Sequence, residues 1–162
     1  MRVFPAVLSV LLLTLTSTPV LARDLQGRVG LGYNAQFDNA STAGGVSALS
    51  LKWAVTKDIA INPIVGVATS NPGNSVFGVK FYKNVFYETN LNFYFLLGGG
   101  LVTGGGASGA QVLGGFGAEF FIPGVESLGF SFEAGGALST LSGTILKTYG
   151  ASLLNAGIHF YF

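Results

Sequence analysis

The last thirteen residues, 150–162, read GASLLNAGIHFYF. Apolar side chains occupy every second position from Leu154 to Phe162, and polar side chains such as Asn155 and His159 lie between them. A period of two predicts a β-strand with two unlike faces. One face is apolar up to the last residue, although the terminus of a soluble domain usually frays into water. A strand whose outer face meets lipid explains the pattern.

The start of the chain is predicted to be a secretory signal peptide, residues 1–22, and not part of the fold. Met1 and Arg2 form a short basic start, and the apolar run 6–15 follows. Val20 and Ala22 fit positions −3 and −1 of a cleavage site. An uncleaved N-terminal membrane anchor is the alternative. Residues 23–162 remain, which is enough for one domain.

The composition is strongly hydrophobic and poor in charge. Charged residues make up 9% of the chain, and the mean hydropathy is +0.57. Even so, residues 23–162 contain no run of about 18 apolar residues, the length of a transmembrane helix. The 25 glycines also disfavour long helices, because each interior glycine costs about 1 kcal/mol relative to alanine. Hydrophobicity spread over many short segments indicates membrane-spanning strands.

The balance of charges excludes several kinds of partner. After residue 22 the basic and acidic side chains are equal in number, so a nucleic-acid partner is not expected. The chain has no cysteine and one histidine, so we expect no disulfide and no zinc site. We expect no cofactor of any kind.

Seven earlier segments repeat the alternation of the final strand. Their bulky apolar side chains share one face, and Gly, Ala, Ser, Asn and charged residues share the other. In a soluble barrel the bulk would lie inside and the charge outside. A closed barrel leaves no unpaired edge in lipid, and eight strands enclose an interior that side chains just fill. We therefore predict an all-β fold for residues 23–162, an eight-stranded antiparallel up-and-down transmembrane β-barrel. The seven segments are 25–37, 45–55, 59–69, 75–82, 89–102, 109–121 and 127–138.

Pro63 lies within one of these segments. It has no N–H to donate to a ladder, so a bulge or a locally unpaired point is predicted there.

This pattern, with its terminal aromatic strand, resembles the small bacterial outer-membrane barrels of the OmpA/OmpX type, whose final residue is typically Phe. The resemblance implies that Ile158, Phe160 and Phe162 form a signal read by the outer-membrane assembly machinery. It also implies export to the outer membrane, with periplasmic chaperones, membrane lipid and lipopolysaccharide as partners. A monomer is expected.

With both termini in the periplasm, the turns 56–58, 83–88 and 122–127 are expected on the periplasmic side. Aromatic side chains near those strand ends should form an interfacial girdle. Phe121 and Tyr161 alternate inward and should plug the rim. The predicted extracellular loops are 38–44, 70–74, 103–108 and 139–149. The predicted girdle consists of Trp53, Phe81, Phe120, Phe130, Phe160 and Phe162.

The charged residues within the predicted strands all fall on the inward face, together with the single histidine. A charge that faces lipid near the midplane costs about 2–4 kcal/mol, so we expect an internal network of ion pairs that plugs the lumen. His159 is expected beside Arg28. A narrow, gated pore for small solutes is the alternative. The predicted network consists of Arg28, Lys52, Lys80, Glu119, Glu133 and His159.

A catalytic alternative brings His159, Ser131 and Glu133 together across two neighbouring strands, as in barrels that hydrolyse or acylate lipid A. No motif flanks a nucleophile, and these side chains face the periplasmic half of the lumen. We therefore expect no enzyme. A structural or surface-interaction role is the main hypothesis.

Three further alternatives concern the surface and the lumen. An adhesion protein would need a long protruding loop, for which 139–149 is the only candidate. A soluble, lipocalin-like periplasmic barrel is also open. The small residues of the upper lumen predict either a cavity for a small apolar ligand or a squeezed barrel. They are Gly30, Gly32, Ala48, Gly66, Ala68, Gly98, Gly115 and Gly135.

Overall fold

The computed structural model describes residues 24–34, 48–69, 73–141, 143–148 and 155–162. The predicted signal peptide and the whole of the predicted loop 38–44 lie outside these ranges. Within them the chain forms β-strands and no helix, so no helix that could cross a membrane is present there. The strands are β1 Val29–Asn34, β2 Ala48–Ala54, β3 Ile59–Ala68, β4 Asn74–Glu88, β5 Leu91–Gly104, β6 Ala107–Ile122, β7 Val125–Ser139, β8 Ile145–Thr148 and β9 Asn155–Tyr161.

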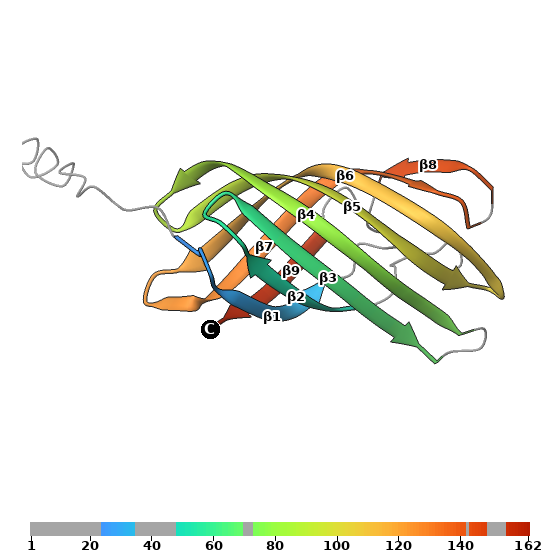
Figure 1. Ribbon diagram of the computed structural model, residues 1–162, viewed down its shortest axis with the longest axis horizontal. Helices are drawn as coiled ribbons and strands as arrows, with labels where there is room; N and C mark the ends of the chain where they lie inside the picture. The colour runs from blue at the N-terminus through green and yellow to red at the C-terminus, as the bar shows by residue number, and fades with distance from the viewer. Residues whose placement is uncertain (1–23, 35–47, 70–72, 142, 149–154) are drawn as a thin grey trace, which may run out of the picture.

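Eight of these strands close into a barrel (Figure 1). The ring consists of β1 to β7 and β9. From β1 to β7 each strand pairs with the one that follows it, and β9 pairs with both β7 and β1; all these pairings are antiparallel. The final strand therefore closes the ring, because Phe160 lies opposite Leu31 on one side and Leu128 on the other. The predicted all-β, eight-stranded antiparallel barrel is confirmed.

Burial alternates along the strands as the sequence pattern predicts. The seven residues of β2 are alternately buried and exposed, with Leu49, Leu51 and Trp53 outside. Outside lie large apolar side chains, such as Val67 at 71% exposure and Phe77 at 66%. Inside lie polar and charged side chains, among which Lys80 has no exposed surface. The barrel is thus apolar outside and polar inside.

Strand β4 is longer than predicted, because residues 83–88 are strand and not turn. The register with β5 shifts between Asn84 and Phe86, so Val85 is an extra, bulged residue. The bulge moves Phe86 to the outer face, opposite Phe93, with 5.7 Å between the ring centroids. The sequence pattern blurred here because a bulge interrupts the period of two.

The predicted loop 103–108 contracts to a two-residue turn. Gly105 and Gly106 both have positive φ angles, +63° and +82°, which a tight hairpin turn of this kind requires. The predicted loop 139–149 contains β8, which pairs with the last four residues of β7 and lies outside the closed ring. We call this end of the barrel the far end.

The opposite end, the near end, carries Phe162 and the turn at residues 55–58 (Figure 1). Tyr87 fastens that turn to β4, because its hydroxyl donates to the Asp58 carboxylate and, at 2.8 Å, to the Lys57 carbonyl. The Lys83 ammonium lies 3.3 Å from Asp58.

The predicted irregularity at Pro63 is confirmed. The β2–β3 register pairs Ser50 with Ile64 and Trp53 with Ile61, and the two positions between them are not paired. Pro63 faces Leu51 in that gap. Because proline has no N–H, the Leu51 carbonyl lacks its ladder donor.

Candidate functional site

The candidate site is the polar interior of the barrel. Strand alternation brings five predicted residues into it, each at most 4% exposed: Lys52, Lys80, Glu119, Glu133 and His159. They come from five different strands, so closure of the ring, and not proximity in sequence, brings them together.

Glycines make room for the large inward side chains. A Cβ atom at Gly30 would come within 2.8 Å of the Tyr161 ring, and one at Gly32 within 2.5 Å of His159. A Cβ at Gly98 would lie 3.0 Å from Leu113. At these positions the small residues face bulky neighbours, so the lumen beside them is filled and the squeezed alternative fits better than a cavity.

The first ion pair joins Lys52 on β2 to Glu119 on β6, with 2.7 Å between Nζ and Oε2. These strands are four steps apart in a ring of eight, so the pair crosses the lumen between opposite walls. The Tyr161 hydroxyl donates to Glu119 Oε1 at 2.6 Å. The Glu119 carboxylate is therefore held from two directions.

The second ion pair joins Lys80 on β4 to Glu133 on β7, at 3.1 Å. Lys80 also donates to Asn34 Oδ1 at 3.0 Å. The hydroxyls of Tyr82 and Tyr94 donate to Glu133 Oε1 at 3.3 and 3.1 Å. Both charges thus have hydrogen-bond partners in addition to each other, as a buried pair requires.

Tyrosine rings connect the two pairs. The Lys52 ammonium lies 4.6 Å from the centroid of the Tyr82 ring and 5.0 Å from that of Tyr94. The two rings meet edge to face, with centroids 5.0 Å apart. The alternation pattern placed Tyr161 on the inward face, but it did not show that the hydroxyls of Tyr82, Tyr94 and Tyr161 bind the two carboxylates. An inward tyrosine in an otherwise small or polar set is the signal that could have found them.

The prediction that His159 lies beside Arg28 was wrong. His159 pairs with Gly32 on β1, and its Nε2 is 2.8 Å from the Ser50 hydroxyl. Arg28 precedes β1 at the near end, where it donates to the Tyr161 carbonyl at 3.1 Å. The prediction was wrong because the β1–β9 register cannot be read from alternation alone.

The three residues of the catalytic alternative do not form a relay. His159 bonds to Ser50, Glu133 is held by Lys80 and two tyrosines, and Ser131 Oγ is buried without a partner among the described residues. Ser50, His159 and Glu119 lie in the order of a Ser–His–acid relay. However, His159 Nδ1 is 3.9 Å from Glu119 Oε1, which is too far for a hydrogen bond. All three are buried.

Other buried polar atoms also lack a protein partner among the described residues. Both side-chain atoms of Gln111 belong to this set, as do Asn62 Oδ1 and Asn92 Oδ1. Buried polar groups of this kind are ordinarily satisfied by ordered water. Bound water is therefore expected between the side chains of the lumen.

The predicted girdle residues all lie on the outer face toward the near end. Trp53, Phe81, Phe160 and Phe162 are exposed there. Phe120 and Phe130 are half-buried because their rings stack on each other, with centroids 5.3 Å apart. Ile158, the remaining residue of the predicted assembly signal, is also exposed on this face.

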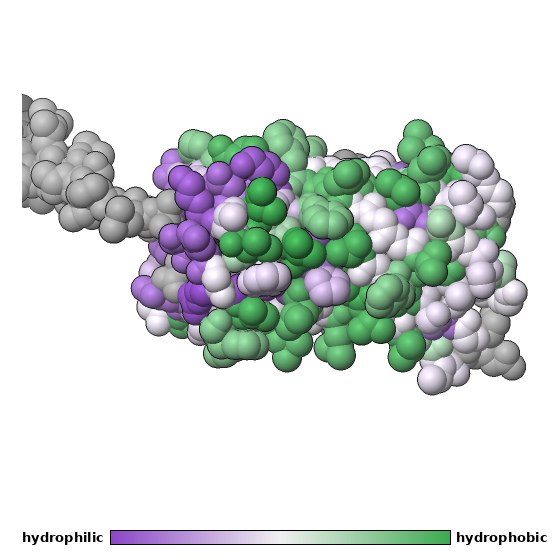
Figure 2. Space-filling view, viewed as in Figure 1, coloured by the Kyte–Doolittle hydropathy of each residue, from purple (hydrophilic) through white to green (hydrophobic). Residues whose placement is uncertain are grey.

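Hydrophilic and hydrophobic residues are separated on the face of the barrel in view. Figure 2 shows hydrophilic residues gathered at the near end and hydrophobic residues over the middle of the barrel. The hydrophilic end includes the exposed side chains of Lys57, Lys83, Glu88 and Glu126 and the half-buried side chain of Asp58.

Within the described ranges, no group of three or more His, Asp or Glu side chains could hold a metal ion. Comparison with models of protein families, with curated protein sequences and with solved structures found no match.

Proposed function

We propose that the chain is an integral outer-membrane β-barrel with a structural or surface-interaction role, whose lumen is plugged by its internal ion pairs. The observation that carries the proposal is the distribution of side chains, which is the reverse of that in a soluble barrel: charged side chains lie inside and large apolar side chains lie outside. Lys80 and Glu119 are at most 1% exposed, whereas Val67, Phe77 and Leu97 are at least 60% exposed.

In water this arrangement would be unfavourable, because charged side chains are buried and apolar side chains are exposed. Exposed apolar surface costs roughly 25 cal/mol per Å², and the outer face is apolar on every strand of the ring. Contiguous apolar surface of this extent marks a contact with a membrane or another protein. A closed ring satisfies its backbone groups internally, which is the requirement for a strand protein in lipid.

The outer membrane is proposed on the sequence features. The predicted signal peptide supports export, and the terminal strand ending in Phe162 resembles the strand that the assembly machinery reads. Periplasmic chaperones, membrane lipid and lipopolysaccharide are the proposed partners, and the barrel acts as a monomer. The near end, with its short turns and both charged and aromatic residues, is the periplasmic end.

The two ion pairs support a plugged lumen. They link β2 to β6 and β4 to β7, so both ion pairs cross the lumen. Opening the lumen at these pairs would separate buried opposite charges and leave each without its partner, which is strongly unfavourable. We therefore propose a closed lumen, and we propose no catalytic role for the barrel.

A narrow pore is the second candidate, because the buried polar atoms without protein partners imply water inside the barrel. Planar-bilayer recordings of the refolded chain decide between the two. We expect no steady conductance for the native chain. Stepwise conductance would contradict the plug and favour the pore. Recovery of the chain in the soluble periplasmic fraction of expressing cells would contradict the membrane location.

A further inference from the structure

The outer wall of the barrel has a hollow beside Pro63. Two depressions, of about 300 and 450 Å³, meet there and share Pro63 and Phe77 in their linings. The first extends over β1 and β2, and the second extends over β4 and β5 toward Gly99. We call the two together the Pro63 groove.

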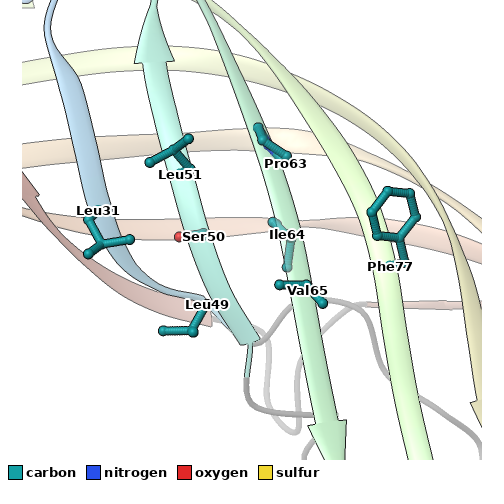
Figure 3. Close-up of a pocket in the computed structure, with 8 residues that line it drawn as sticks. All are labelled: Leu31, Leu49, Ser50, Leu51, Pro63, Ile64, Val65 and Phe77. Atoms are coloured by element: carbon teal, nitrogen blue, oxygen red, sulfur yellow. The ribbon is translucent and has the colours of Figure 1, made fainter.

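The break in the β2–β3 ladder explains the first depression. Ser50 and Ile64 face inward and are only 2% exposed, yet both contribute to its lining, so the wall is thin between the two strands. Figure 3 shows Leu49, Leu51 and Val65 around the gap, with Ser50 and Ile64 in its floor.

Small side chains explain the second depression. Pro63, Val79 and Gly99 lie opposite one another on three adjacent strands, so the outer surface is recessed along this row. Phe77 and Leu101, both more than 60% exposed, stand above the row on its far-end side. The groove is thus a shallow channel between taller apolar side chains.

The geometry points to a binding site for one acyl chain of a membrane lipid in the Pro63 groove. This inference rests on the proposed membrane location. Each depression reaches the lower limit of small-molecule sites, about 300–1,000 Å³. The groove opens outward within the exposed apolar surface, so in a membrane its neighbours are lipid tails.

A polar ligand does not fit this lining. The Ser50 hydroxyl is bound to His159, and the other lining side chains are aliphatic, aromatic or glycine. The only polar feature that the gap supplies is the Leu51 carbonyl, which lacks its ladder donor. An acyl chain gives this carbonyl no donor, so its contribution is to fill space in the groove that would otherwise lack contacts.

The test uses a phospholipid that carries a photoactivatable group in its acyl chain. The full-length chain is refolded into vesicles that contain this lipid, irradiated and digested, and the labelled peptides are mapped. We expect labelling to concentrate on the residues of the groove, with Phe77, Val79 and Leu101 prominent. Labelling spread evenly over the outward residues of all eight strands would overturn the proposal.

A matched pair of variants sharpens the test. In Gly99→Val the new Cβ meets only the Gln111 carbonyl, at 3.9 Å, so the side chain fits and fills the groove. In Gly114→Val the new Cβ lies 3.7 Å from Leu96 and Leu97, outside the groove. Labelling of the groove should be lost in Gly99→Val and kept in Gly114→Val. Equal labelling in both variants would contradict a specific site.

The two proposals fail differently. If Trp53 fluorescence is quenched by brominated lipid but labelling is even, the membrane location stands and the acyl-chain site falls. If neither quenching nor labelling occurs in the folded protein, both fall. If Gly99→Val does not fold, the distribution of labels on the native chain still decides the question.

Discussion

Breaking the Lys52–Glu119 pair should cost far more stability than breaking a surface ion pair. The side chains are 6% and 2% exposed, and the charged atoms are 2.7 Å apart. An exposed pair contributes about 0.2–1 kcal/mol. Removing one partner of a buried pair costs about 3–5 kcal/mol, because the other charge is left without compensation.

We therefore expect Lys52→Met and Glu119→Gln each to lower the free energy of unfolding by about 3–5 kcal/mol. In Glu119→Gln the ammonium of Lys52 keeps its contacts with the Tyr82 and Tyr94 rings, so the loss should lie toward the lower limit. The double variant leaves no unpaired charge. It should lose much less than the sum of the single losses.

Urea unfolding of the chain refolded in detergent, followed by Trp53 fluorescence, measures these energies. Lys83→Met serves as the control, because its pair with Asp58 lies at the surface and its loss should change stability much less than the loss of a buried pair. Single losses below about 1 kcal/mol, or strict additivity in the double variant, would refute the buried network.

The remaining predictions concern three other contacts. His159→Ala should lower the free energy of unfolding by about 1–3 kcal/mol, because it leaves the Ser50 hydroxyl without a partner; an unchanged value in urea unfolding would contradict this. Deletion of Phe162 should reduce the heat-modifiable, folded form in the outer membrane of cells; a normal folded yield there would count against the assembly signal. The hydrogen bond from Tyr87 and then that from Lys83 lower the pKa of Asp58 from 3.8, so their stabilisation is present above about pH 4 and lost as pH falls through the lowered pKa. Asp58→Asn should remove this acid-side loss from the unfolding midpoint, and an unchanged pH profile would contradict the contact.

The fold could be predicted from the sequence because one signal, the period of two, is repeated in every strand. Each strand places bulk such as Leu49 or Phe77 outside, so a single physical rule orders the whole ring. Errors occurred where that rule is broken. The bulge at Val85 reverses the faces beyond it, so strand residues were taken for a turn.

The inward position of the charged residues could also be predicted, but their partners could not. Alternation tells that Lys52 and Glu119 face the lumen. It does not tell which residues meet across it, because that depends on the tilt of the strands and the register between neighbours. The misplacement of His159 beside Arg28 has this cause, as does the missed role of the tyrosine hydroxyls.

The central claim is that the outer apolar face contacts lipid, and Trp53 reports on it directly. It is the only tryptophan of the chain, and it lies on the outer face of β2 with 48% of its surface exposed. The chain is refolded into vesicles whose lipids carry bromine at defined positions of the acyl chain, and the fluorescence is compared with that in unbrominated vesicles. We expect strong quenching, greatest when bromine lies near the head group, because Trp53 belongs to the near-end girdle. Unquenched fluorescence from folded, vesicle-bound protein would contradict the claim.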